Sequence, residues 1–333
     1  MLFVLLISLL TNINAVNIDL NSDQIGLSLM GDLEGRSIIL KVKDNAGKTI
    51  ATFKPTSGST FYRGEFASFR LAEFVGLGAL YPQTEIAYLT PKTQNKVKAL
   101  LENVKYDKDY GDKHQGQMTR KEENRVIILE EMNRNIETNK NMNGALKLWI
   151  TDIQFYKPLG SKIGFRLHPV YKYIKASGPQ PPHKMYTVKQ CTQLLEPKGC
   201  MSGIAYLDQL TKDMSSIMLL DAVIGNGDRF PGGNVHFKLT GKAARLFSLD
   251  NGAVLRPGDT TSLDTLKEFG ISRFVKQYVD KLRALKDMST PAVMELLGLA
   301  PEDYEIFKVN LNNTLKYVDE LQKKFGNEIW FKA

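Results

Sequence analysis

The chain has few of the residues on which zinc sites and disulfide-rich folds depend. Only two cysteines and four histidines occur among its 333 residues. The histidines, His114, His168, His183 and His236, form no i, i+4 pair and have no CxxC partner, so the sequence does not indicate a zinc site. The G-x-S-x-G elbow of serine hydrolases is also missing. No RNA-binding signature or zinc-finger spacing appears, so nucleic acid is not an expected partner.

Long apolar runs are missing as well, and the N-terminus holds a short one. Residues 2–10, LFVLLISLL, are too few to cross a bilayer as a helix, so no stable membrane span is expected. Residues 1–15 instead form a candidate signal peptide that ends at Ala15, although no lysine or arginine precedes the apolar run. Cys191 and Cys200 would suit one disulfide in an oxidising compartment. We therefore expect a secretory-pathway or secreted protein, and a cytoplasmic one if residues 1–15 are retained.

Length and charge agree with one two-lobed unit that binds acidic partners. A chain of 333 residues that is 43% hydrophobic can bury a large core. Its formal net charge of +8 favours nucleotide, phosphate or acidic protein as a partner. Solvated surface lysines would give the same charge, so net charge alone does not identify a partner.

Residues 219–255, LLDAVIGNGDRFPGGNVHFKLTGKAARLFSLDNGAVL, carry the clearest chemical pattern. Asp228, Asn234 and Asp250 fall on two short loops, each of which adjoins an apolar run. Phosphoryl transfer needs divalent metal, accurate positioning and a carboxylate that orients the incoming hydroxyl. Magnesium prefers hard oxygen ligands, so Asp250 and Asn234 are candidate metal ligands and Asp228 is the candidate base. Taken singly, DR and DNG are also ordinary turn sequences.

The first part of the chain supplies a lysine and a glutamate in the order that a kinase requires. Residues 49–55, TIATFKP, predict a strand with Lys54 near its end. Glu65 follows at the start of a helical apolar pattern that begins GEFASF. In kinases, a strand lysine paired with a helix glutamate holds the phosphates of ATP. The alternative is that Lys54 is one of many lysines and that Glu65 is a first-turn acid favoured by the helix dipole.

The motifs FKP, GEFASF, GNGDR and LDNG together resemble those of atypical kinases of the secretory pathway, the Golgi casein kinase and four-jointed group. The resemblance implies an α+β, two-lobed protein kinase-like fold with a small antiparallel β lobe and a larger, mainly helical lobe. It also implies that Lys54 binds the nucleotide phosphates, Glu65 pairs with Lys54, Asp228 is the catalytic base and Asp250 binds metal. ATP with Mg²⁺ or Mn²⁺ would be the cofactors.

Two features depart from that family. Asn234 follows Asp228 by six positions, whereas the metal-binding asparagine of most kinases follows by five, so the Pro-Gly-Gly run at 231–233 decides whether Asn234 is a second ligand. The sequence DRFP resembles the actin-fragmin kinase branch, since Golgi casein kinases have a histidine-rich continuation there. The branch is therefore left open.

The coarse organisation places the small lobe first. Residues 16–155 are expected to form the nucleotide-binding N-lobe, and residues 156–333 the C-lobe with the catalytic and metal-binding loops and C-terminal helices. Gly31 and Gly35 lie between two predicted strands, 24–30 and 37–42, and are the candidate phosphate-binding loop.

Further elements are predicted along the rest of the chain. Further strands are predicted at 83–89 and 145–153, with a kinase-like hinge at 151–153 and an extended crossing between lobes at 157–186. Residues from about 104 to 143 are predicted to form a charged, solvated insertion that contains a short strand at 126–129. A helix is predicted at 207–223, and helices follow residue 262 almost to the end.

The sequence thus favours an ATP-dependent kinase that phosphorylates serine or threonine of a protein. A lipid or sugar kinase on the same fold is an alternative, because no residue visibly reads the acceptor. A nucleotide-binding pseudokinase is another, because the spacing of Asn234 is unusual.

Overall fold

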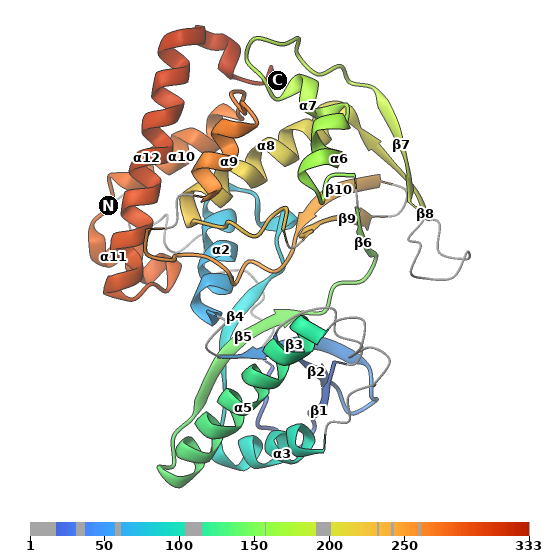
Figure 1. Ribbon diagram of the computed structural model, residues 1–333, viewed down its shortest axis with the longest axis vertical. Coiled ribbons are helices and arrows are strands. Elements are labelled where there is room, and N and C mark those ends of the chain that lie inside the picture. The colour runs from blue at the N-terminus through green and yellow to red at the C-terminus, as the bar shows by residue number, and fades with distance from the viewer. Residues whose placement is uncertain are drawn as a thin grey trace, which may run out of the picture.

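The computed structural model describes residues 18–30, 37–56, 61–103, 115–156, 158–190, 201–231, 233–240, 243–258 and 261–332. Two five-stranded sheets organise two lobes that lie end to end (Figure 1). The candidate signal peptide, Gly31, Gly35 and both cysteines lie outside the described residues. The predicted α+β, two-lobed architecture is confirmed.

The small lobe is an antiparallel sheet in the order β1-β2-β3-β5-β4. Its strands are β1 (Gly26–Leu29), β2 (Leu40–Lys43), β3 (Thr49–Pro55), β4 (Thr84–Leu89) and β5 (Met142–Leu148). The strands expected near the N-terminus and at 49–55 and 83–89 are all present. In β3, Ala51 and Phe53 are fully buried, whereas Thr52 and Lys54 lie on the opposite face.

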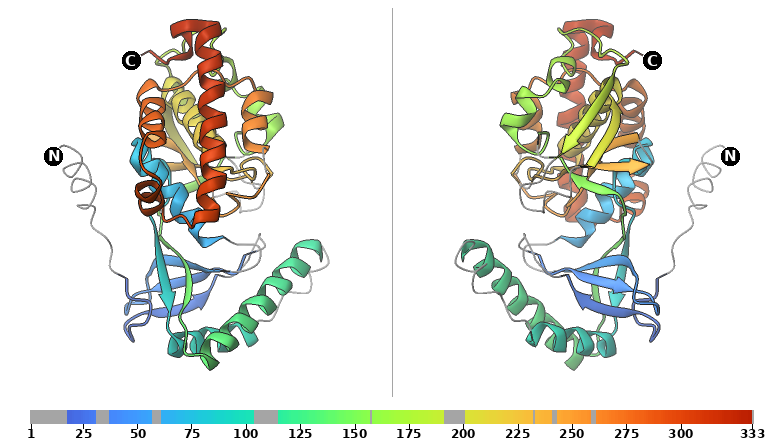
Figure 2. Two further views of the ribbon diagram at one scale, coloured as in Figure 1. Left: turned by 90° about the vertical axis from the view of Figure 1, so that its left-hand side faces the viewer. Right: turned by 90° about the vertical axis from the view of Figure 1, so that its right-hand side faces the viewer.

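Two helices cover the face of the small sheet that carries Phe53. They are α3 (Pro91–Glu102) and α5 (Gln115–Glu137), which also pack against each other, and Figure 2 shows them below and beside the strands of the small sheet. The strand predicted at 126–129 is wrong, because these residues lie within α5. Ile128 and Met132 are fully buried one helical turn apart, so a single helical stripe enters the core while the charged residues of α5 remain outside.

The chain crosses between the sheets at residues 149–152. Strand β5 ends at Leu148, and β6 (Ile153–Phe155) already pairs with β9 (Val235–Thr240) in the second sheet. This crossing comes a few residues before the boundary expected from the sequence, and it splits the strand predicted at 145–153. The extended crossing at 157–186 is also wrong, because its prolines separate short elements of the larger lobe.

The larger lobe surrounds a central helix. Its sheet has the order β6-β9-β10-β8-β7. Besides β6 and β9, the elements of this lobe in chain order are α6 (Lys162–Leu167), α7 (Val170–Tyr173), β7 (Met185–Gln190), β8 (Met201–Tyr206), α8 (Leu207–Ile224), β10 (Ala243–Ser248), α9 (Thr261–Glu268), α10 (Lys276–Lys286), α11 (Thr290–Leu297), α12 (Pro301–Phe325) and the 3₁₀ turn η3 (Gly326–Ile329). Helix α8 is buried on nearly all sides because it lies between the sheet and the other helices, and its buried residues include the acids Asp213 and Asp221. None of the helices in the described ranges is both long and apolar enough to span a membrane.

Helix α2 (Tyr62–Val75) joins the two lobes. It contacts β4 and β5 of the small sheet and also α8, α10 and α11 of the larger lobe. Leu71, Ala72 and Val75 are buried in the larger hydrophobic core, and the helix ends at Gly76, whose φ of 95° suits glycine. The 3₁₀ turn η1 (Gly78–Leu80) then leads to β4. The first turn of α2, which contains Glu65, is therefore fixed relative to both lobes.

Candidate functional site

Three of the residues singled out in the sequence meet directly between the lobes. The Nζ of Lys54 lies 2.7 Å from Oδ1 of Asp250 and 3.3 Å from Oε1 of Glu65. Lys54 and Glu65 are buried, whereas the side chain of Asp250 is about half exposed at 52%. Lys54 comes from the end of β3, Glu65 from the first turn of α2, and Asp250 from the loop after β10. The fold therefore brings together residues that are 196 positions apart.

A second lysine shares the same glutamate. Lys147 of β5 pairs in register with Thr52 of β3, so it lies on the same face of the sheet as Lys54. Its Nζ is 2.9 Å from Oε1 of Glu65, closer than Lys54 is. The backbone N–H of Asn251 donates to the other carboxylate oxygen of Glu65 at 3.0 Å. The buried carboxylate is thus satisfied by three donors.

The charges of this cluster stabilise one another. Burial alone would lower the pKa of Lys54, but attraction to Asp250 and Glu65 outweighs that effect and raises the pKa above its usual range. The positive charges of Lys54, first, and of Lys147 hold the pKa of Asp250 well below its usual range. Lys54 is therefore a cation and Asp250 an anion at neutral pH, as binding of phosphate and of metal would require.

The loop that carries Asp250 has a strained backbone and approaches α2 closely. Asp250 has a φ of 51°, in the left-handed region, where Asp and Asn are the commonest residues after Gly. Gly252 follows, and a Cβ at that position would lie 3.2 Å from Oε1 of Glu65. The glycine of the LDNG motif therefore allows the loop to lie against Glu65.

Arg229 connects this loop to the loop of Asp228. Its buried guanidinium donates to both carboxylate oxygens of Asp221 on α8, at 2.8 and 2.7 Å. It also donates to the carbonyl oxygens of Asn234 and Leu249, at 2.6 and 3.3 Å, and to Oδ1 of Asn251 at 2.8 Å. One side chain thus joins the end of α8, the catalytic-loop candidate and the Asp250 loop.

Asp228 and Asn234 lie within the same network. The side-chain amide of Asn234 donates to the carbonyl oxygen of Asp228 at 3.2 Å, and the N–H of Asp228 donates to Oδ1 of Asn226 at 3.1 Å. The additional residue between Asp228 and Asn234 is accommodated by a turn, in which the N–H of Asn234 donates to the carbonyl oxygen of Arg229 and Gly233 has a φ of 64°. The unusual spacing therefore does not remove Asn234 from the loop that contains Asp228.

A pocket opens beside Asp228. It has a volume of about 240 Å³ and is lined by Gly227, Asp228, Ala253, Arg256 and Thr261. Arg256 is exposed and makes no ion pair with a carboxylate of the described residues. A hydroxyl-bearing substrate that entered this pocket would meet one carboxylate and one guanidinium.

The donor set suits magnesium or manganese better than zinc. No cluster of three or more His, Cys, Asp and Glu side chains that could hold a metal occurs in the described parts of the chain. Asp250 offers a half-exposed carboxylate and Asn234 a side-chain amide oxygen, and magnesium prefers oxygen ligands of these kinds, with substrate phosphates and water completing its shell. The residues present therefore fit a metal that binds together with a nucleotide.

Two contributors to this site were not identified from the sequence. Lys147 gave no signal, because one lysine at the end of a strand looks like the many others in this basic chain. Asp221 did offer one, since an acid within the apolar run LLDAVI needs a buried partner. For Arg229, the neighbour of Asp228, the sequence suggests that it orients Asp228 or pairs with a charged group nearby, and the structure identifies that group as Asp221.

Sequence comparison finds no matching family model and no matching curated protein. Structural comparison finds the crystal structure of the Golgi casein kinase, with a TM-score of 0.52 at 16% sequence identity. The match covers 92% of this chain and 74% of that chain. At this identity the likeness concerns the fold, and it agrees with the two lobes and with the antiparallel sheet of the smaller one. The chain therefore has the two-lobed, kinase-like fold that the Golgi casein kinase also has.

Proposed function

We propose that this protein is an ATP-dependent kinase that phosphorylates serine or threonine hydroxyls of a protein. The observation that carries the proposal is the 2.7 Å contact between Lys54 and Asp250, with Glu65 3.3 Å from the same amine. A phosphate-binding cation beside a metal-binding carboxylate is the arrangement on which phosphoryl transfer depends. The kinase-like fold supports the same conclusion.

Each residue of the site has a defined task in this proposal. Lys54 would bind the nucleotide phosphates, and Glu65 would hold its amine in place. Asp250 and Asn234 would hold Mg²⁺ or Mn²⁺, which when bound neutralises the charge of the transferring phosphoryl group. Asp228 would orient the acceptor hydroxyl and accept its proton.

The pocket beside Asp228 supports an acidic protein as the acceptor. Arg256 lies in this pocket, so an acidic side chain near the acceptor hydroxyl would have a partner there. The chain's net charge of +8 would favour the same class of substrate over long range. A secreted or secretory-pathway location is part of this proposal, and the mass of the mature secreted protein tests whether residues 1–15 are removed.

The decisive experiment measures transfer from labelled ATP in the presence of Mn²⁺ to an acidic, serine-rich protein and to the enzyme itself. Asp250→Ala is expected to abolish the transfer, and Asp228→Asn to reduce it by about 10²–10⁴-fold. Arg256→Gln, outside the metal and phosphate groups, should weaken transfer to the acidic protein while leaving hydrolysis of ATP unchanged. Circular dichroism of each variant controls for folding.

The alternatives predict different results. Transfer to lipid or sugar but never to protein identifies another kinase class on this fold. Binding of ATP without transfer to any acceptor identifies a pseudokinase. Full activity of Asp228→Asn would show that the base is wrongly assigned, whichever acceptor is used.

A further inference from the structure

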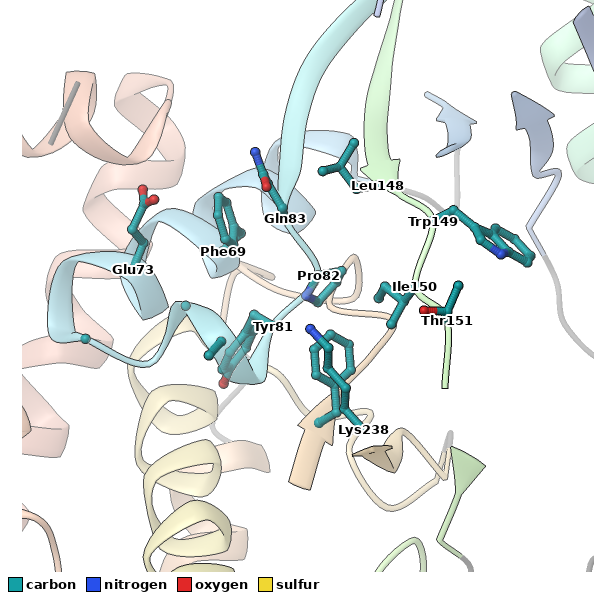
Figure 3. Close-up of a pocket in the computed structure, with 14 residues that line it drawn as sticks. Phe69, Glu73, Tyr81, Pro82, Gln83, Leu148, Trp149, Ile150, Thr151 and Lys238 are labelled. Carbon is teal, nitrogen blue, oxygen red and sulfur yellow. The ribbon is translucent and has the colours of Figure 1, made fainter. Parts of the chain in front are cut away.

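A half-open groove lies where α2 ends and the chain crosses between the lobes. Its volume is about 580 Å³, within the range of ligand-binding sites. Figure 3 shows Glu73 of α2 on one side of the groove and Thr151 of the crossing on the other. None of the five described candidate site residues lines it. The groove is therefore separate from the site built around Lys54 and Asp250.

One wall of this groove has unused hydrogen-bond donors. The backbone N–H groups of Ile150 and Thr151 donate to no acceptor within the described ranges, and neither does the side-chain amide of Gln83. Trp149 is 39% exposed, whereas the other rings of the lining are almost completely buried. A ligand would therefore meet mainly polar groups, and the carbonyl oxygens of an extended peptide are suitable acceptors for such donors.

Two lysines add positive charge at separate places along the groove. Lys238 of β9 lines it beside the crossing, because Lys238 pairs in register with Ile153. Lys281 of α10 lies near the end of α2, with its Nζ 3.5 Å from the position that a Cβ at Gly76 would occupy. Neither lysine forms an ion pair with a carboxylate of the described parts of the chain. Both ammonium groups are thus available to an acidic ligand.

The carboxylates near these lysines already have partners. Glu73 is the one acid among the residues that line the groove, and it binds Arg70. Asp213 binds Arg245, which is the cross-strand neighbour of Lys238, at 2.6 Å. The groove therefore carries positive charge that no neighbouring acid compensates, and this charge favours an acidic partner.

We propose that this groove binds an acidic segment of a protein partner in an extended conformation, with its carboxylates paired with Lys238 and Lys281. An extended chain can place one carboxylate at each lysine while its backbone bonds to the crossing, whereas a small anion would reach only one of them. If the proposed kinase function is right, the groove would hold an acidic substrate at a distance from Asp228. Binding of the acidic segment itself does not rest on that function.

The probe for the test is a short fluorescein-labelled peptide of glutamate, glycine and alanine. It has no hydroxyl to be phosphorylated, so it reports binding without catalysis. Its neutral counterpart has glutamine in place of each glutamate. Fluorescence anisotropy measures the affinity of both peptides, and thermal unfolding confirms that each variant is folded.

The variants separate local charge from net charge and from shape. Lys238→Met and Lys281→Met each remove one ammonium from the groove. Lys308→Met on α12 is the matched control, because it lowers the net charge equally but lies outside the groove. Ala79→Glu adds a carboxylate at an exposed position of the lining, and Ala79→Gln adds a side chain of the same size without charge.

The wild-type protein should bind one equivalent of the acidic peptide, and more weakly as the salt concentration rises. Lys238→Met should weaken binding by about tenfold, the effect of one hydrogen bond to a charged group. Lys281→Met should weaken it by about two- to threefold, because Lys281 is exposed. Ala79→Glu should weaken binding more than Ala79→Gln does, and Lys308→Met should leave the affinity unchanged.

Several outcomes would overturn the proposal. They are a wild-type protein that does not bind the acidic peptide, equal binding of the neutral peptide, or a Lys238→Met or Lys281→Met affinity equal to that of Lys308→Met. Displacement of the peptide by ATP with Mn²⁺, or loss of binding in Arg256→Gln, would show that the peptide occupies the candidate active site instead. If no phosphoryl transfer is found but the peptide binds as described, the kinase function fails and this inference stands.

Discussion

Removal of the Arg229 guanidinium tests how the catalytic and metal-binding loops are held together. The change is Arg229→Met, which keeps an unbranched apolar side chain and removes all five hydrogen bonds. Two of these bonds reach the buried carboxylate of Asp221, and the other three reach the loops of Asn234 and Asp250. Both Arg229 and Asp221 are almost completely buried, so water cannot replace the lost donors without rearrangement.

The expected loss is large relative to the stability of a domain. Breaking a buried ion pair by removing one partner costs about 3–5 kcal/mol, because the remaining charge is buried without compensation. Net stabilities are about 5–15 kcal/mol, so the Arg229→Met protein should fold but unfold at clearly lower urea concentration. Replacing both partners, as in Asp221→Leu with Arg229→Met, should cost less than the sum of the two single changes.

A second arginine–aspartate pair provides the control. Arg245 binds both oxygens of Asp213 at 2.7 and 2.6 Å, but the side chain of Arg245 is 44% exposed. Without Arg245, Asp213 keeps the side-chain amide of Gln209 and the N–H of Leu246 as donors. Arg245→Met should therefore destabilise the protein by only about 1–2 kcal/mol.

The pH dependence adds a second test. Burial raises the pKa of Asp221, and Arg229 opposes that rise, so Arg229→Met should raise the pKa further. A folded carboxyl with a raised pKa binds a proton more readily than in the unfolded chain, so the loss is full above the folded pKa and shrinks as the pH falls. Urea unfolding at pH 7 and pH 5 should show a smaller deficit at pH 5. A deficit no larger than that of Arg245→Met, or one unchanged by acidification, would refute this account of the buried pair.

Two further predictions concern other buried groups. If the proposed function is right, Lys147→Met should raise the KM for ATP by about tenfold with less change in kcat, because Glu65 loses its nearer ammonium, whereas Lys147→Arg should retain most of the affinity. Equal effects of the two variants in steady-state kinetics would argue against this charge-dependent role. Burial lowers the pKa of His168 to about 4, so the folded protein resists protonation and should lose roughly 2–3 kcal/mol of stability from this group as the pH falls from about 6.5 to 4. His168→Gln should flatten that part of the acid dependence in urea titrations, and an unchanged slope would count against it.

The sequence was most informative for elements whose apolar residues recur with one clear period. Strand β3 alternates between core and cleft, and the apolar residues of α8 recur along the whole helix, so both could be recognised with nearly correct bounds. Helix α5 could not be recognised, because charged residues separate its few buried ones. The short apolar run around Ile128 is equally compatible with a strand. Such a run can be assigned only when its packing partner, here α3, is known.

The residues of the candidate site also fall into two groups, those that the local sequence predicts and those that it does not. Lys54, Glu65, Asp228 and Asp250 could be selected because their residue types occur in the order that phosphoryl transfer suggests. Lys147 depends on strand register, since only the pairing of β5 with β3 places it on the face of Lys54. The bonds of Arg229 depend on the conformation of two loops, including the left-handed backbone of Asp250. Neither strand register between distant segments nor loop conformation is encoded in local spacing.

The two lysines suggest how the site could accept a charged ligand without losing its geometry. Lys54 is nearer to Asp250 than to Glu65, whereas Lys147 is close to Glu65. The two ammonium groups balance the two carboxylates, so Lys54 and Glu65 can both be buried. If a metal binds Asp250 as proposed, Lys54 loses its nearest partner and becomes available to phosphate. Glu65 would still be neutralised by Lys147 and held by the N–H of Asn251, so the first turn of α2 need not move when the nucleotide enters.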